Sequence, residues 1–158
     1  MPNQHLPPGH RSLRKGRVSI PGQVYLITAT THRRHPIFID FSLARQACRC
    51  FQDPKLLEDT KMLAWVLMPD HAHWLIELGH AHALSELVKR LKSASALQVN
   101  RERRCRQAVW DRAFHDRALR KEESIVGAAR YVVANPLRAG LARTTGEYPF
   151  WDASWLQV

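Results

Sequence analysis

Two apolar segments joined by a Pro-Asp pair constrain the fold of this chain more than any other feature. Residues Lys61–Met68 and His71–Leu78 are each long enough for one strand, and only Pro69 and Asp70 separate them. A tight turn of this composition between two aliphatic and aromatic segments predicts a β-hairpin. We therefore expect an antiparallel pair of strands near the middle of the chain.

The second strand of this hairpin carries two histidines at alternate positions. Side chains two residues apart on a strand project from the same face, about 7 Å apart at the backbone. His71 and His73 would share one face with Leu75 and Glu77, and the opposite face would carry the more apolar set, Ala72, Trp74, Ile76 and Leu78. The pair could hold one metal ion or could be two exposed strand histidines, because an H-x-H pattern alone is a weak motif.

Strands and helices are expected to alternate around the hairpin. The predicted elements are a strand over Gln23–Thr31, a helix from an Asp40 cap to Gln52, a helix over Leu84–Arg101, a strand over Gln107–His115 and a helix over Glu122–Asn135 that ends at Pro136. This β-α-β-β-α-β order with a further C-terminal helix is typical of α+β sandwiches of the ferredoxin-like or RRM-like kind. Helices cover one face of the antiparallel sheet in such folds, so we expect the face with His71 and His73 to be open to a ligand.

The positive charge of the chain is concentrated in two segments. The net charge is +10; residues 1–35 carry six Lys or Arg and no acidic residue, and residues 89–121 carry eleven against three. Such blocks commonly bind phosphate groups, since neutralising a polyanion releases its counterions. A solvated basic face is the alternative, but aromatic residues among the charges favour nucleic acid as the partner.

Length and cysteine content suggest one reduced, intracellular domain. The 158 residues divide most simply into a basic N-terminal arm, 1–22, and a single domain, 23–158. The cysteines, Cys48, Cys50 and Cys105, form neither an even framework nor a C-x-x-C pair, which favours the cytoplasm. No apolar run approaches the roughly 18 residues of a membrane span, and we expect no secretory signal.

Tyr131 and Asn135 form a second chemically interesting pair. They lie four residues apart on the last predicted helix, so their side chains share one face. A phenol can act as a nucleophile towards phosphorus, and an amide oxygen is a hard ligand for Mg²⁺ or Mn²⁺. Tyr131 could equally be a core anchor with a hydrogen-bonded hydroxyl, and Asn135 a helix C-cap before proline.

Four segments in a fixed order resemble one known family. They are GQVYLITATTHRRHPIF at the first strand, VLMPDHAHWL at the hairpin, WDRAFHDRALR at Trp110–Arg120 and YVVANPLRAGL at Tyr131–Leu141. Together they are similar to the REP-associated tyrosine transposases, a bacterial branch of the HUH single-strand DNA endonucleases, over about Arg11 to Trp151. The family fold is an antiparallel sheet flanked by helices, in agreement with the predicted element order.

The resemblance implies a catalytic set. It makes His71 and His73 ligands of a divalent metal, Mg²⁺ or Mn²⁺, and Tyr131 the nucleophile that forms a 5′-phosphotyrosine intermediate. Asn135 occupies the position of a third, amide ligand, where relatives usually have the longer Gln. The implied activity is cleavage and transfer of single-stranded DNA beside hairpins of repetitive extragenic palindromic (REP) sequences, by a cytoplasmic protein that associates with the nucleoid and is more often a monomer than a dimer.

The predicted DNA contacts come from the two basic segments and from the third of the matching segments. The candidates are Arg11, Arg14, Lys15, Arg17, Lys89, Arg90, Lys92, Arg112 and His115. The main rival interpretation is a non-catalytic domain that binds nucleic-acid hairpins. A zinc deaminase using H-x-H is disfavoured, because the P-C-x-x-C partner motif is absent from the sequence. A second histidine pair, His80 and His82, lies in a predicted loop and is expected to be a solvated feature.

Overall fold

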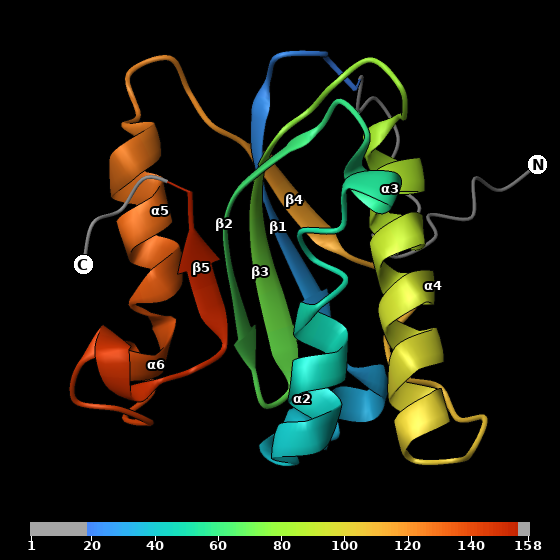
Figure 1. Cartoon of the computed structure of the whole chain (residues 1–158). Helices are drawn as coiled ribbons and strands as arrows, with labels where there is room; N and C mark the ends of the chain where they lie inside the picture. The colour runs from blue at the N-terminus through green and yellow to red at the C-terminus, as the bar shows by residue number, and fades with distance from the viewer. Residues whose placement is uncertain (1–18, 155–158) are drawn as a thin grey trace, which may run out of the picture.

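The computed structural model describes residues 19–154, which form a sheet with helices on both sides (Figure 1). The 3₁₀ turns are η1 (His32–Arg34), η2 (Ile37–Ile39) and η3 (Thr145–Glu147). The strands are β1 (Val24–Thr30), β2 (Lys61–Met68), β3 (His71–Glu77), β4 (His115–Ala118) and β5 (Trp151–Ala153), and the helices are α2 (Phe41–Cys48), α3 (Pro54–Leu57), α4 (Leu84–Glu102), α5 (Ile125–Val133) and α6 (Asn135–Arg138). No described helix is long and apolar enough to cross a membrane.

The sheet is antiparallel and has the order β4-β1-β3-β2-β5. The first four strands and the helices α2 and α4 reproduce the predicted β-α-β-β-α-β arrangement, so the expected α+β sandwich is confirmed. The hairpin is also confirmed: β2 and β3 pair from Lys61 with Glu77 to Met68 with His71. Hydrogen bonds from the backbone N–H and the hydroxyl of buried Thr31 to the Asp70 carbonyl tie its turn to the end of β1.

The main core lies between the sheet and the helices α2 and α4. The apolar side of β3 faces it as predicted, with Ala72, Trp74, Ile76 and Leu78 all buried. Phe51 packs edge-on against Trp65 and Trp74, which provides the offset geometry that aromatic rings prefer. This core fixes the face of β3 on which the histidines lie, because a shift of one residue would bury them in place of Trp74.

The opposite face of the sheet is only half open, which corrects the expectation of an uncovered face. Helix α5 packs over β2 and β3, and its Ala129 and Val132 are fully buried against a second apolar cluster that includes Ala64, Val66 and Leu75. Figure 1 shows α5 and α6 on one side of the sheet and α2, α3 and α4 on the other. The helix predicted to carry the tyrosine is therefore the element that covers part of the histidine face.

The strand predicted over Gln107–His115 was wrong. Only an isolated bridge between Thr31 and Trp110 forms in that stretch, and regular pairing with β1 begins at His115. Val109, Trp110 and Phe114 are all buried although this stretch forms no regular strand pairing. The Lys92 ammonium donates to the Asp111 and Ala113 carbonyls, so these acceptors are engaged away from a strand ladder.

The end of the chain also differs from expectation. Helix α5 begins at Ile125, later than the predicted Glu122, because Ser124 caps it by accepting a hydrogen bond from the Gly127 N–H. The carboxylate of Glu123 instead binds Arg117 at 2.7 Å. After Val133 the chain starts a new short helix, α6, whose first turn accommodates Pro136, and β5 adds an unpredicted strand beside β2.

Candidate active site

His71 begins β3 and is held by the residue before it. Its Nδ1 lies 2.8 Å from an Asp70 carboxylate oxygen, and Asp70 also binds Arg34 at 3.1 Å. Partial burial would raise the pKa of Asp70, but the His71 hydrogen bond and the Arg34 charge outweigh it and lower that pKa. A carboxylate accepts only, so Nδ1 carries the proton and Nε2 of His71 presents its lone pair.

His73 is held from the neighbouring strand. Its Nδ1 lies 2.9 Å from the Thr28 hydroxyl oxygen, directly across from it in the β1–β3 pairing. Burial, then the adjacent His71, then the positive charge of Arg138 lower the pKa of His73 to about 4. His73 is therefore neutral at physiological pH, which is the protonation state in which imidazole binds metals.

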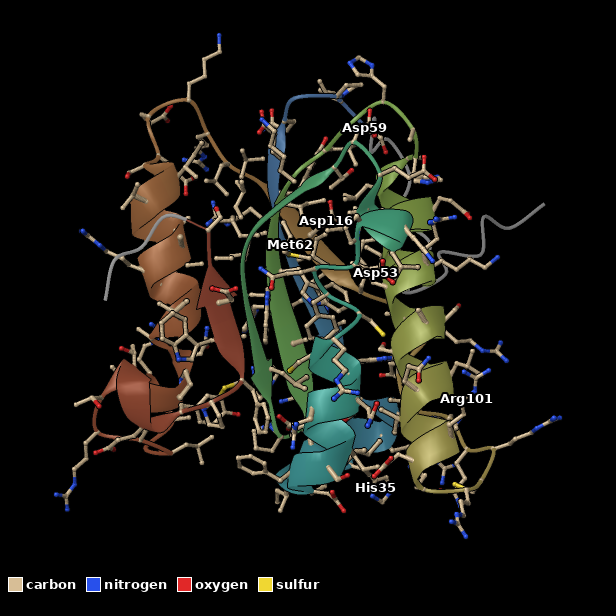
Figure 2. All side chains as sticks on the ribbon, viewed as in Figure 1. His35, Asp53, Asp59, Met62, Arg101 and Asp116 are labelled. Atoms are coloured by element: carbon tan, nitrogen blue, oxygen red, sulfur yellow. The ribbon has the colours of Figure 1, made fainter. Side chains whose placement is uncertain are left out.

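The two imidazole rings converge at the end of the sheet. Their centroids lie 4.9 Å apart at an interplanar angle of 82°. In Figure 2, the labelled His35 lies at this end of the sheet, near the β2–β3 turn, and the labelled Asp59 lies at the opposite end. Neighbouring side chains on β2, Val66 and Met68, are buried, so the pair lies at the border between the covered and the uncovered half of its face.

The donor set fits a metal ion with open coordination positions. Each histidine engages its Nδ1 on a neighbour, the arrangement by which proteins orient Nε2 towards a metal. Among the described residues no group of three or more His, Cys, Asp or Glu side chains comes together here or elsewhere. Two imidazoles alone leave positions for a further oxygen ligand and for a substrate phosphate.

Tyr131 lies on the outward side of α5 and is not a core anchor. The side chain is 56% exposed, whereas Ala129 and Val132 on the same helix are fully buried against the sheet. Tyr131 also lines a shallow groove of about 330 Å³ with Leu26 of β1 and Arg117 of β4. Its phenol is therefore accessible from the uncovered half of the sheet face.

Asn135 caps the end of α5, as the second interpretation of this residue proposed. Its amide nitrogen donates to the Val132 carbonyl at 2.8 Å and more weakly to the Tyr131 carbonyl at 3.4 Å. This use of the nitrogen leaves the amide oxygen as the atom that can face a ligand. Capping and metal binding are thus compatible, and the role of Asn135 as third ligand stays a prediction.

Arg138 packs against Tyr131. Its guanidinium carbon lies 3.8 Å from the centroid of the Tyr131 ring, and one of its nitrogens donates to the Tyr131 carbonyl at 2.7 Å. Its charge is also the smallest of the three causes that lower the pKa of His73. Short helix α6 therefore places a cation against the exposed tyrosine of the candidate active site.

The predicted DNA contacts fall into three regions. His115 lies on the histidine face, because β4 pairs it with Thr28 and β3 pairs Thr28 with His73. Lys89, Arg90 and Lys92 belong to α4, on the other side of the sheet (Figure 1). Arg11, Arg14, Lys15 and Arg17 lie outside the described residues.

The basic side chains of α4 differ in whether they bind backbone carbonyls of the protein. Arg90 donates to the Lys55 and Leu56 carbonyls, and Lys92 donates to two carbonyls of the segment before β4, so both stabilise the fold. Lys89 is exposed. Lys89, Lys92 and the exposed Arg112 line a groove of about 510 Å³ beside Trp110. DNA that reached both this groove and the histidines would have to pass around the β4 edge of the sheet.

Sequence reasoning missed three residues of the site. Thr28 was visible only as part of a strand, because its contact with His73 depends on strand register. Asp70 was assigned to the turn, although its position next to His71 made a carboxylate–histidine pair possible. Arg138 stands seven residues after Tyr131, a spacing that would have placed the two on one helical face had the helix been expected to continue past Pro136.

Comparison with known proteins shows to which family the chain belongs. A model of the family "Transposase IS200 like" matches residues 20–132, a range that contains His71, His73 and Tyr131. A Haemophilus influenzae protein assigned as a REP-associated tyrosine transposase is 21% identical over 98 residues, which are 56% of this chain and 56% of that protein. The chain thus matches only about half the length of this relative.

Two solved structures share the fold. One is a REP-associated tyrosine transposase bound to a REP hairpin, with a TM-score of 0.63 and 21% identity over 85% of this chain and 79% of that one. The other is a Deinococcus radiodurans protein assigned as a transposase, with a TM-score of 0.55 and 22% identity over 75% of this chain and 94% of that one. The resemblance drawn from the sequence is confirmed, and the chain belongs to the IS200-like transposase family.

Proposed function

We propose that this protein cleaves and rejoins single-stranded DNA beside a hairpin through a covalent bond to Tyr131. The observation that carries the proposal is that two oriented histidines and an exposed tyrosine lie on one side of the sheet, where Arg138 contacts the tyrosine. Family membership supports a transposase. The active species is proposed to be a monomer.

The histidines supply a site for a divalent cation. His71 and His73 would hold Mg²⁺ or Mn²⁺ through Nε2, and the oxygen of Asn135 would complete the protein ligands. A cation bound there would polarise the phosphodiester and stabilise the charge that develops on its non-bridging oxygens. Asp70 and Thr28 keep the two rings oriented, so that the site is formed before DNA arrives.

Tyr131 provides the nucleophile. Its phenolic oxygen attacks phosphorus in line, forms the Tyr131 O–P bond and gives up its proton to solvent. The bond between phosphorus and the 3′ oxygen breaks, and that oxygen takes up a proton as a free 3′-hydroxyl. A second 3′-hydroxyl can reverse the step, since the phenolate is a competent leaving group, so strand transfer needs no external energy source.

The substrate is proposed to be a hairpin with a single-stranded flank. An exposed tyrosine on a partly covered sheet face can reach an unpaired backbone more easily than a continuous duplex. One structural neighbour is bound to a REP hairpin, and this chain has a net charge of +10 for contacts with phosphates. A cytoplasmic setting with access to chromosomal DNA agrees with the three free cysteines.

A cleavage assay tests the proposal. The protein would be incubated with labelled oligonucleotides that carry REP-type hairpins, with Mg²⁺, Mn²⁺ or EDTA, and denatured before electrophoresis. We expect a covalent protein–DNA adduct and a cut strand only with a divalent metal. His71→Ala and His73→Ala should remove both products, and a scrambled strand that cannot form the hairpin is the matched substrate control.

The alternative function is a hairpin-binding domain without catalysis. It would retain the basic surface and the sheet, and it predicts tight hairpin binding with no adduct under any metal condition. Adduct formation by the wild type that survives in Tyr131→Phe would contradict the assignment of the nucleophile. Binding without cleavage across a panel of hairpins would favour the alternative.

A further inference from the structure

Arg138 lies against the proposed nucleophile, and the reaction described above gives it no role. Its guanidinium stacks on the Tyr131 ring with Cζ 3.8 Å from the ring centroid. One N–H group donates to the Tyr131 carbonyl at 2.7 Å, a bond that helps to end α5. The side chain is exposed, and its guanidinium has further N–H groups besides the one used in this bond.

The location of this cation relative to the reacting groups is specific. A phosphate attacked by Tyr131 and bound at the histidine site must lie between the phenol and the imidazoles. Arg138 lies over the ring of the proposed nucleophile and is bonded to its backbone. It is thus beside the atom at which the proposed function places the attack on the scissile phosphate.

We propose that Arg138 binds the scissile phosphate and holds the Tyr131 ring for in-line attack. The inference rests on the proposed function, since it assigns a substrate contact within the same site. A guanidinium carries five N–H donors in a planar fork that matches phosphate oxygens, and only one bond is needed for the Tyr131 carbonyl. The charge would counter the negative charge on the non-bridging oxygens while the stacked plane limits rotation of the phenol.

Lysine would not replace arginine in this role. An ammonium group supplies a charge but no flat surface to lie on the ring and no fork for two oxygens. Arg138→Lys should therefore retain part of the activity, and Arg138→Ala should lose more. Arg130 provides a matched control, because it is an exposed arginine adjacent to Tyr131 on α5 that also carries one positive charge.

The first measurement is the rate of adduct formation at saturating hairpin DNA. Loss of one preorganised donor to a reacting phosphate is expected to slow Arg138→Ala by about 100-fold. Arg130→Ala should stay within about threefold of the wild type, as expected for a charge outside the site. The thermal unfolding temperature of each variant shows whether a slower reaction results from loss of stability. A rate for Arg138→Ala equal to that of Arg130→Ala would overturn the proposal.

The second measurement separates a phosphate contact from a purely structural role. Hairpin binding is measured for Tyr131→Phe and for Tyr131→Phe with Arg138→Ala, using DNA with either a phosphate or an uncharged methylphosphonate at the scissile position. We expect the methylphosphonate to weaken binding by about tenfold in the first protein and by less than about twofold in the second, as a double-mutant cycle requires of contacting groups.

Two other outcomes distinguish the possible failures. An equal loss with methylphosphonate in both proteins would show that Arg138 does not contact this phosphate, even if the wild type forms the adduct. A wild type that forms no adduct, together with the predicted binding cycle, would contradict the proposed catalysis while supporting the phosphate contact.

Discussion

Thr28 on β1 and His73 on β3 face each other across the sheet, with the hydroxyl oxygen of Thr28 2.9 Å from Nδ1 of His73. The contact joins residues 45 positions apart in the chain. It lets the sheet itself orient a proposed metal ligand, because strand pairing brings the hydroxyl to the ring.

Thr28→Val should weaken metal binding while leaving the fold intact. The variant removes the partner of His73 Nδ1, and loss of such an outer contact typically costs 10- to 100-fold in metal affinity. The measurement is Mn²⁺ titration by calorimetry. Thr30→Val is the control, since Thr30 lies opposite His71 in the same strand pair but its hydroxyl points to Asp111. Equal Mn²⁺ affinities for the two variants would contradict the proposed role of Thr28.

Substitutions at Asn135 should separate capping from metal binding. Asn135→Ala and Asn135→Asp both lose the amide donor to the Val132 carbonyl, so each should reduce the free energy of unfolding by about 1 kcal/mol. Only the alanine variant also loses the ligand oxygen, and it should need about tenfold more Mn²⁺ for half-maximal adduct formation. The same Mn²⁺ requirement in both variants would show that Asn135 is not the third ligand.

Val132→Ala should destabilise the protein through the docking of α5. The Val132 side chain is fully buried between this helix and the sheet, and removal of two methyl groups from such a site costs about 2 kcal/mol. Ile125→Ala is the control at the start of α5: it removes one carbon more than Val132→Ala, but the side chain is 39% exposed, so the cost should be about 0.5 kcal/mol. Urea unfolding measures both. A similar loss in the two variants would contradict the packing of α5 described above.

Tyr148 should make stability decline at alkaline pH. Its hydroxyl donates to the Leu67 carbonyl at 2.6 Å, and burial, followed by nearby Cys48, raises its pKa to about 12. The phenol of the unfolded chain loses its proton near pH 10, about two pH units earlier, so this contribution to stability is present below pH 10 and lost as pH rises towards 12.

Comparison with Tyr148→Phe isolates this effect from other titrating groups. The variant should be less stable than the wild type by about 1 kcal/mol at pH 8, because the Leu67 carbonyl loses its donor. The difference should shrink or reverse between pH 10 and 11.5 in urea unfolding experiments. A difference that does not change with pH would mean that Tyr148 titrates normally in the folded protein.

The sequence predicted those parts of the fold that follow from local patterns. The hairpin was predictable because the residues of β3 alternate between core and histidine face, and the Asp40 cap of α2 was predictable because its carboxylate accepts from the Ser42 and Leu43 N–H groups. The segment before β4 was mistaken for a strand, because Trp110 and Phe114 suggest a strand but are buried by an irregular path. Such a path depends on distant partners, among them Lys92 and Thr31.

As with the fold, the sequence predicted only those residues of the candidate site that follow from local patterns or from the family resemblance. His71 and His73 follow from spacing on one strand, and the family resemblance added Tyr131. The contacts of Thr28 and Arg138 could not be predicted in the same way. The first requires the register between β1 and β3, and the second requires a helix that restarts at Asn135 after α5 has ended. The half-covered sheet face was unexpected as well, because hydrophobic pattern alone does not say on which side of the sheet the last helix docks.

The identity of the covalently modified residue tests the central claim most directly. Trypsin should cleave after Arg130 and Arg138 and release the peptide YVVANPLR, which contains Tyr131. After reaction with hairpin DNA and nuclease digestion, mass spectrometry should find this peptide carrying a nucleotide through its 5′ phosphate on the tyrosine. The same adduct on Tyr25 or Tyr148, or cleavage of the DNA with this peptide unmodified, would contradict the account.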